Sequence, residues 1–468
     1  MKKRMYKIMA LAMTAAMVVP MAAQTTAFAA DDKEITYWNI AVESPDKDIV
    51  TAAVDKFNKE TKSGYTVNSV AIQNDTYKEK LVIAMSSGEC PDMYSSWSGG
   101  PMYEYIDSGF AQPIDDLLDQ SDIKDKLLDA AIEQGSYKGH VYAIPYMNVV
   151  LAGIFYNKDM FKQYGLEEPK TLADLENICA TLKENGITPF ALANASKWTG
   201  SMYFMSLAAR YGGLEPFQNA VAGTGKFTDD CFIKAGEKIQ EWVNNGYFPD
   251  GVNSLSEDDG QAKQLMYQET AGMLLCGSWY TGTFQTDSEE FYQKIGWFPF
   301  PAIDDSDADP TIQIGTVGDQ FISFNCEGDK LAAAFECATD HLSDEVEDMI
   351  YSTGKIAPVK DAGDHISDPV VKEIFDAAQK ASSIQLWYDQ YLPTSVASAH
   401  LDGLQEVFGL TKTPQEAQEE MQKAMDEYLS TKSDSGAADD TAEEATDDAA
   451  ADDTAEEATD DAAADDAE

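Results

Sequence analysis

Hydrophobic and polar residues recur with two different periods in the first hundred residues, and these periods predict alternating strands and helices. Strands are predicted by "EITYWNI" from Glu34 and by the later runs "YTVNSVAI" and "PDMYSS". A helix starting with Ser44 as cap and Pro45 in its first turn follows the first strand. Helical spacing marks two apolar stripes: Ile49, Ala53, Val54, Phe57, and then Tyr77, Leu81, Ala84, Met85. This order predicts a parallel sheet covered by helices on both faces.

The pattern changes after Tyr137. A long extended segment, "GHVYAIPYMNVVLAGIFYN", leads into a series of helices that continues to Gln268. One of these helices is marked by Thr171 as its cap and Gly186 as its stop. Further short strands are then predicted by "AGMLLC", "IGWFPFP" and "QFISFN". The return to strands after many helices predicts two lobes with more than one crossing between them.

The two ends of the chain differ in composition from the rest. Residues 1–30 carry a basic start, an apolar stretch and an Ala27-Phe28-Ala29 cleavage pattern, which together indicate a signal peptide. The first cysteine is Cys90, so the signal lacks a lipid-anchor cysteine. Residues 434–468 contain "ADDTAEEATDDAA" twice in succession, which predicts a disordered acidic tail. We therefore expect an exported protein, extracellular or periplasmic, without a lipid anchor.

Charge and motifs argue against several classes of function. The net charge of −49, from 33 basic and 82 acidic residues, disfavours binding to nucleic acid or to an anionic membrane. "GTGKFT" at Gly223 lacks two required positions of a phosphate loop, and "DDSDADP" at Asp304 departs from a calcium loop. The four histidines are scattered, so no metal site and no cofactor are expected. A glycosidase carboxylate pair and a Cys326–Cys337 disulfide both stay open.

Large aromatic residues follow several predicted strands. Trp38 ends the first strand, Trp97 follows the third, and Trp279 with Tyr280 follows "AGMLLC". Ligands of parallel sheets bind beyond the carboxyl ends of the strands. An aromatic face covers the C–H face of a sugar ring, while neighbouring polar groups bind its hydroxyls. The positions of these residues therefore favour a sugar site over purely structural tryptophans.

The chain also resembles the family 1 extracellular solute-binding proteins of ABC sugar importers. The resemblance is carried by "YKEKLVIAMSSGECPDMYSSW", "YAIPYMNVVLAGIFYNKDMFKQYGLEEPKTLADL", "AGMLLCGSWYTG", "IGWFPFPA" and "GKIAPVKD", in matching order. It implies an α/β protein of the two-lobed, class II periplasmic-binding type. Each lobe would be a mainly parallel sheet flanked by helices, with a ligand cleft between the lobes. Lobe 1 would comprise 31–148 with 316–358, and lobe 2 would comprise 149–315 with 359–430.

The same resemblance implies the ligand, the partner and the site. The protein would be a monomer that captures an oligosaccharide, raffinose-like or another short one, by hinge closure. It would deliver this ligand to an ABC importer permease and would have no enzymatic activity. A secreted carbohydrate-active enzyme and a polysaccharide-binding surface adhesin are the alternatives. The implied ligand-binding residues are Asn39, Glu43, Ser96, Trp97, Ser98, Trp198, Trp279, Tyr280, Asp319, Trp387, Asp389 and Gln390.

Overall fold

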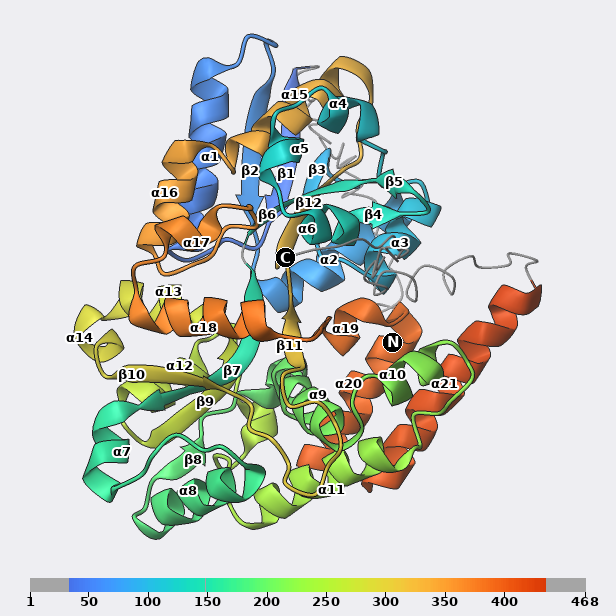
Figure 1. Ribbon diagram of the computed structural model, residues 1–468. Helices are drawn as coiled ribbons and strands as arrows, with labels where there is room; N and C mark the ends of the chain where they lie inside the picture. The colour runs from blue at the N-terminus through green and yellow to red at the C-terminus, as the bar shows by residue number, and fades with distance from the viewer. Residues whose placement is uncertain (1–32, 148, 435–468) are drawn as a thin grey trace, which may run out of the picture.

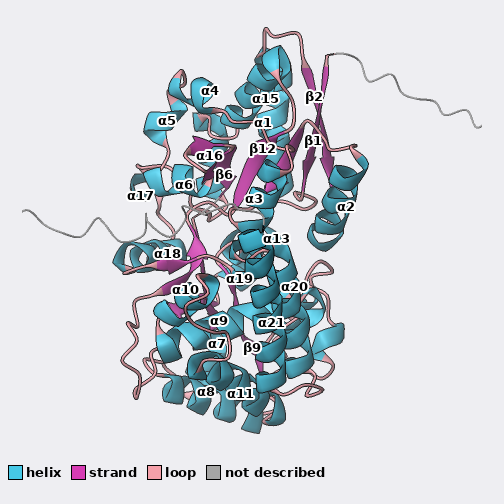
Figure 2. Cartoon of the chain, turned by 90° about the vertical axis from the view of Figure 1, so that its right-hand side faces the viewer, coloured by secondary structure: helices cyan, strands magenta, loops and turns pink. Residues whose placement is uncertain are grey.

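The computed structural model describes residues 33–147 and 149–434, which form two sheet-based halves joined at a waist (Figure 1). In the side view of Figure 2 the halves lie one above the other, each with helices packed around its strands. The signal peptide predicted at 1–30 lies outside the described residues. The predicted acidic tail also lies outside them, except for Asp434 at the end of the last helix.

The upper half in Figure 1 contains a five-stranded sheet in the order β2-β1-β3-β12-β6. Its strands are β1 (Glu34–Asn39), β2 (Thr66–Ala71), β3 (Met93–Ser96), β6 (Ala143–Met147) and β12 (Gln320–Phe324). β1 pairs in parallel with β2 and β3, whereas β12 is antiparallel to both β3 and β6. The alternation along β1 buries Ile35 and Tyr37 completely, as its period of two requires.

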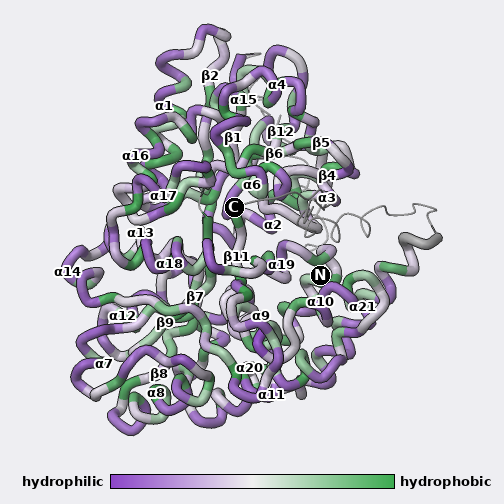
Figure 3. Tube along the Cα trace, in the orientation of Figure 1, coloured by the Kyte–Doolittle hydropathy of each residue, from purple (hydrophilic) through white to green (hydrophobic). Residues whose placement is uncertain are grey.

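The lower half contains a sheet in the order β13-β11-β7-β9-β8, with β10 also paired to β7. Its strands are β7 (Val150–Asn157), β8 (Thr188–Phe190), β9 (Ala271–Gly277), β10 (Ile295–Pro299), β11 (Gln313–Thr316) and β13 (Ile384–Gln385). β7 is buried at every position, and its first residues, Val150 to Ala152, belong to the hydrophobic green range of Figure 3, while polar Asn157 ends it. A strand buried on both faces carries such a continuous apolar run.

The two sheets are mixed, each with one strand that runs against all the others. In the first sheet this strand is β12, and in the second it is β7. Both follow directly on a strand of the other sheet, without an intervening helix. The mainly parallel arrangement expected from strand–helix alternation therefore holds for the remaining strands, and the two direct crossings account for the reversed ones.

Three chain segments run side by side where the halves meet. The first joins β6 to β7, the second joins β11 to β12 through residues 317–319, and the third includes Ile356. The backbone N–H of Asp319 donates to the carbonyl of Met147 at 3.1 Å, and that of Val149 donates to Ile356 at 2.9 Å. The waist is thus a short hydrogen-bonded bundle of three connections rather than a single linker.

Helices of the first half cover both faces of its sheet. They include α1 (Asp46–Glu60), α2 (Asn74–Ser87), α3 (Gly100–Asp107), α15 (Gly328–Asp340) and α16 (Asp344–Ser352). α1 begins one residue later than the sequence predicted, with Pro45 at the N-cap position, and no side chain caps it, so the Ser44 cap is wrong. Asp46 and Asp48 instead place negative charge in its first turn, which stabilises the positive end of the helix dipole.

The second half is the more helical one. Around its sheet lie α7 (Lys158–Tyr164), α8 (Leu172–Glu184), α9 (Trp198–Gly212), α11 (Asp230–Asn244), α12 (Gln261–Tyr267), α13 (Tyr280–Asp287), α18 (Pro369–Lys380), α19 (Tyr388–Tyr391), α20 (Thr394–Phe408) and α21 (Pro414–Asp434). The predicted Thr171 cap of α8 forms a full capping box with Asp174. α9 is buried at every position from Thr199 to Arg210, so it forms the helical core of this half.

Two further features bear on the sequence-based expectations. All six cysteines are free thiols, so Cys326 and Cys337, whose pairing the sequence left open, form no disulfide. Five of the six are buried, as small apolar residues commonly are. Among the described helices, none combines the length and the apolar character needed to span a bilayer.

Candidate functional site

A cavity of about 190 Å³ lies between the two halves and is lined by residues of both. The first half contributes the β1–α1 connection, and the second contributes the loop before α12 and the turn between β9 and α13. The lining residues are Ile40, Ala41, Val42, Glu43, Ser44, Pro45, Asp46, Gln73, Glu257, Asp258, Gly260, Lys263, Trp279, Tyr280 and Thr283.

Trp279 lies on the cavity wall just beyond the end of β9. It occupies the N-cap position of α13 and is partly exposed. Its ring folds back over Gly277, where an added Cβ would lie 1.9 Å from the Trp279 Cζ3 atom. Gly277 is therefore required by this ring position, because any side chain there would displace the indole.

Two further tryptophans hold Trp279 in place. The Trp198 ring lies 5.9 Å from it, measured between centroids, and the Trp387 ring lies 6.2 Å away in an edge-to-face arrangement. Trp387 is 3% exposed, so it acts mainly as a buried support. The indole N–H of Trp198 donates to the Asp75 carboxylate at 3.3 Å, across the waist. These three rings, Trp198, Trp279 and Trp387, form the Trp279 cluster, but Trp198 and Trp387 are not among the residues that line the cavity.

The cavity also contains a carboxyl group held by a tyrosine. The Tyr280 hydroxyl donates to Oε1 of Glu257, and Tyr280 itself is 3% exposed. Burial raises the pKa of Glu257 to about 7, with the hydrogen bond from Tyr280 acting in the opposite direction. Oε2 of Glu257 has no hydrogen-bond partner among the described residues. This oxygen is therefore available to a ligand hydroxyl.

Charged side chains link the two halves beside the cavity. Glu43, after β1, lies 3.4 Å from the Lys263 ammonium on α12, which also pairs with Asp287 at 3.0 Å. The backbone N–H of Asp75 donates to the Asp258 carboxylate at 3.0 Å. These contacts hold the lining segments of the first half against those of the second.

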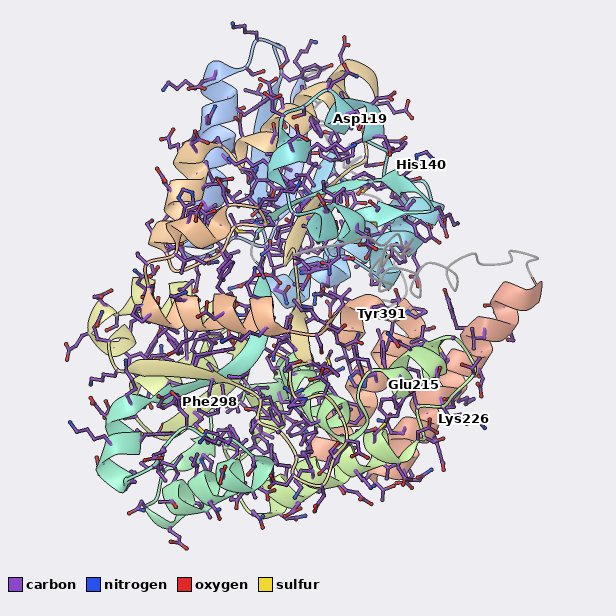
Figure 4. The ribbon with its side chains drawn as sticks, in the orientation of Figure 1. Asp119, His140, Glu215, Lys226, Phe298 and Tyr391 are labelled. Atoms are coloured by element: carbon purple, nitrogen blue, oxygen red, sulfur yellow. The ribbon has the colours of Figure 1, made fainter. Side chains whose placement is uncertain are left out.

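Two other predicted residues, Trp97 after β3 and Asp389 on α19, meet at Lys78 of α2. α2 and α19 face each other across the waist in Figure 1. The Lys78 ammonium lies 4.9 Å from the Trp97 ring centroid and 3.6 Å from the Asp389 carboxylate. Trp97 also packs edge-to-face on Tyr77 at 5.9 Å. Tyr391, at the end of α19, marks this side of the waist in Figure 4. Trp97 and Asp389 are brought together here, but neither lines the cavity.

The backbone explains why α19 approaches the first half so closely. An added Cβ on Gly99 would lie 2.2 Å from the carbonyl oxygen of Gln390. One on Gly100 would lie 2.3 Å from that of Leu392. The pair of glycines after β3 therefore lets the predicted Gln390 segment pack directly on the first half.

Other predicted residues use their polar atoms inside the first half. The Asn39 side chain donates to the Ser69 hydroxyl at 2.8 Å and accepts from the Ala41 backbone N–H at 3.0 Å. The Ser96 and Ser323 hydroxyls are 2.7 Å apart, joining β3 to β12. Ser98 is buried and, like these residues, lies outside the cavity lining. As they stand, Asn39 and Ser96 stabilise the strand ends.

Asp319 lies in the second crossing, immediately before β12, and is almost completely buried. Burial raises its pKa to about 7, against the opposing effect of the nearby Lys355 charge. It is not among the residues that line the cavity. It belongs instead to the waist bundle, where its backbone N–H donates to the Met147 carbonyl.

Several polar residues of the cavity were missed by the sequence reasoning. The cavity is lined by Asp46, Gln73, Glu257, Asp258 and Lys263. None of them is a large aromatic residue, and the prediction relied on large aromatics at strand ends. "SEDDG", from Ser256, has the composition of a solvated acidic loop. Its proximity to Tyr280 is a tertiary contact between residues 23 positions apart in the sequence, so no local signal could have indicated it.

Two halves, three crossing connections and an aromatic cavity between them define a two-lobed solute-binding protein. The chain belongs to the bacterial extracellular solute-binding protein family, whose model matches residues 41–338. The family resemblance and the fold expected from it are thus confirmed. Membership places the chain among exported proteins. The family is non-enzymatic, which agrees with the expected absence of catalysis.

Individual relatives are similar over part of their length. An uncharacterized ABC transporter extracellular-binding protein from Pyrococcus horikoshii is 28% identical over 288 residues, covering 60% of this chain and 64% of the relative. A maltotriose-binding protein from Pyrococcus abyssi is 28% identical over 241 residues, 51% of this chain and 48% of the relative. The chain thus spans about half to two thirds of the length of these curated relatives.

Solved structures match over most of the chain. One, from work on xylan utilization by Caldanaerobius polysaccharolyticus, is 28% identical with a TM-score of 0.77, covering 83% of this chain and 99% of its own. A sugar transporter structure from Bacillus licheniformis, in complex with stachyose, is 20% identical with a TM-score of 0.68, covering 83% and 98%. The second match concerns the fold alone.

Proposed function

We propose that this protein is the sugar-binding component of an ABC importer and that it captures a short oligosaccharide between its two halves. The observation that carries the proposal is the placement of Trp279, which is fixed by Gly277 and lines a cavity shared by both halves. An aromatic platform beside carboxylate, amide and hydroxyl groups matches the mixed apolar and polar faces of a sugar ring.

Capture would occur by hinge closure, with lobe 1 comprising 31–148 with 316–358 and lobe 2 comprising 149–315 with 359–430. All strands of the first sheet fall within the ranges of lobe 1. All strands of the second sheet fall within the ranges of lobe 2, except for Thr316, the last residue of β11. The three hydrogen-bonded crossings are suited to act as the hinge. The 190 Å³ of the cavity is small for an oligosaccharide, so ligand entry would require the halves to part.

The relatives suggest which sugars to test. Their names and titles refer to maltotriose, xylan and stachyose, and the family resemblance favours raffinose-like or other short oligosaccharides. The proposed ligand is therefore a saccharide of a few rings. The proposed partner is the membrane permease of the importer, with the protein acting as a monomer.

A thermal-shift screen followed by calorimetry tests the proposal. Maltotriose, xylotriose, raffinose and stachyose should be screened individually, because a ligand that binds only the native state raises the melting temperature. We expect at least one to bind with a 1:1 stoichiometry and to be recovered unchanged. Cleavage of the sugar by repurified protein would support the enzyme alternative. Binding only to insoluble polysaccharide would support the adhesin alternative.

A further inference from the structure

We propose that the cavity selects uncharged saccharides over those carrying a uronic acid, and that Glu257 is the main residue responsible for this discrimination. The inference rests on the proposed sugar-binding function and adds a ligand class to it. Its starting point is the imbalance of charge in the cavity lining. Four carboxylates line it against a single ammonium group: Glu43, Asp46, Glu257 and Asp258 against Lys263.

The basic groups near the cavity already have partners within the protein. Lys263 lies between Glu43 and Asp287, at 3.4 and 3.0 Å. Lys355 is buried and paired with Asp46, and Lys78 is shared between Asp389 and the Trp97 ring. A ligand carboxylate would have to compete with a protein carboxylate for each of these ammonium groups.

Arginine, which binds carboxylates most effectively through its paired N–H groups, is also absent from the cavity. Arg210 is the one arginine in the described part of the chain. It is buried in α9 and donates to the backbone carbonyls of Phe300, Pro301 and Ile312. The remaining positive feature is the N-terminal end of α13, whose dipole amounts to about half a charge.

Among the four carboxylates, Glu257 is the least compensated. Glu43 and Asp46 are paired with lysines, and Asp258 accepts the backbone N–H of Asp75. Glu257 receives only the Tyr280 hydroxyl and leaves Oε2 without a partner among the described residues. That oxygen can accept a bond from a sugar hydroxyl but repels another carboxylate, so it both attracts neutral sugars and excludes acidic ones.

Matched pairs of trisaccharides test this inference. Maltotriose, cellotriose and galactotriose are each compared with the same trisaccharide whose terminal C6 hydroxymethyl group is oxidised to a carboxylate. Calorimetry is performed at pH 8, above the pKa of about 7 of Glu257, and in 150 mM salt to screen the net charge of the whole protein. For any trisaccharide that binds, the oxidised form should bind about tenfold more weakly or worse.

Two variants assign the effect to Glu257. Glu257→Gln keeps the shape and removes the charge, so it should reduce the neutral-to-acidic preference at least about threefold. Glu184→Gln, an identical change at the exposed end of α8, should leave the preference unchanged. Glu257→Ala also removes the charge and is the second variant, expected to reduce the preference in the same direction, should Glu257→Gln fail to fold by circular dichroism.

The outcomes separate this inference from the function on which it rests. Binding of an oxidised trisaccharide within twofold of its neutral parent would overturn the inference while leaving sugar binding intact. A preference that survives Glu257→Gln, or Glu257→Ala in its place, undiminished would overturn the assignment to Glu257. Absence of binding to all three pairs and to the screening sugars would overturn the proposed function, and the inference with it.

Discussion

Trp279 and Trp97 occupy the same kind of position in the sequence but have different surroundings in the structure. The Trp279 cluster contains Trp198 and Trp387, and the Trp97 cluster contains Tyr77 and Lys78. Each tryptophan follows the carboxyl end of a buried strand, β9 or β3, close to the waist. Trp279 lines a cavity, whereas the Trp97 ring is already covered by Lys78, which Asp389 from the other half neutralises. An aromatic at a strand end is therefore a candidate for ligand binding only where the protein leaves its face uncovered.

The same difference extends to the acidic residues of the two regions. Glu257 faces the cavity with a free carboxylate oxygen, whereas Asp389 forms an ion pair across the waist. Asp319, with a pKa raised like that of Glu257, is enclosed in the crossing instead. We therefore expect ligand affinity to depend strongly on the Trp279 region and weakly on the other two.

Trp279→Ala should have the largest effect on affinity. Removing the platform should weaken binding of the best saccharide from the screen at least about tenfold, since 1.4 kcal/mol corresponds to tenfold. Stability of the free protein should fall by much less than the 3–5 kcal/mol typical of a large core residue, because Trp279 is partly exposed. Calorimetry and thermal melts measure the two quantities. A large loss of stability with unchanged affinity would assign Trp279 to the core.

Gly277→Ala should have the next largest effect, and it acts through the same ring. The new Cβ would overlap the indole, 1.9 Å from Cζ3, so the ring must move. We expect affinity to fall roughly fivefold in the presence of Trp279 and to change little in the Trp279→Ala background. Calorimetry on the double-mutant cycle measures this coupling. Equal losses in both backgrounds would show that Gly277 matters for the strand rather than for the ring.

Trp97→Ala tests the Trp97 cluster, and it should weaken saccharide affinity by less than about threefold. Its ring contacts Tyr77 and Lys78, so the main loss should be in thermal stability, through packing and the cation–π contact. Melting curves and calorimetry on the same preparations distinguish this outcome from that of Trp279→Ala. A tenfold loss of affinity here would place Trp97 in the ligand site and remove the contrast between the clusters.

Asp319→Asn should leave affinity within about twofold but change the pH dependence of stability. The folded-state pKa of about 7 lies above the ordinary value of 3.8, so the folded protein favours the protonated form. The contribution of Asp319 therefore lowers the free energy of unfolding of the wild-type protein as pH rises from about 4 to about 7. Above that range this decrease stays constant. The substitution removes this decrease and should stabilise the protein by roughly 4 kcal/mol at pH 8, with little effect near pH 4.

Denaturant unfolding at the two pH values measures this difference. Asp250→Asn, at an exposed position, serves as the control and should show no such pH dependence. If Asp319→Asn were destabilising by the same amount at both pH values, Asp319 would be a structural hydrogen-bonding group rather than a buried acid that resists ionisation.

Periodicity and capping are local properties, and they determined much of the fold from the sequence alone. The apolar run of β9, the alternation of β1 and the Thr171 cap of α8 lie where the sequence predicted them. Trp279 could also be placed just beyond β9, because Gly277 and Ser278 end the apolar run. Together with the motif order, these signals were sufficient to identify the family.

Tertiary packing decided the direction of β7 and β12, because each depends on which sheet the chain enters after a crossing. It also decided which polar residues face the ligand space. Asn39 and Ser96 turn inward to satisfy buried groups, whereas Glu257, in an ordinary-looking acidic loop, reaches the cavity beside Tyr280. The hydrogen-bond partners of a polar side chain often lie far away in the sequence, so its role depends on which distant segments fold against it.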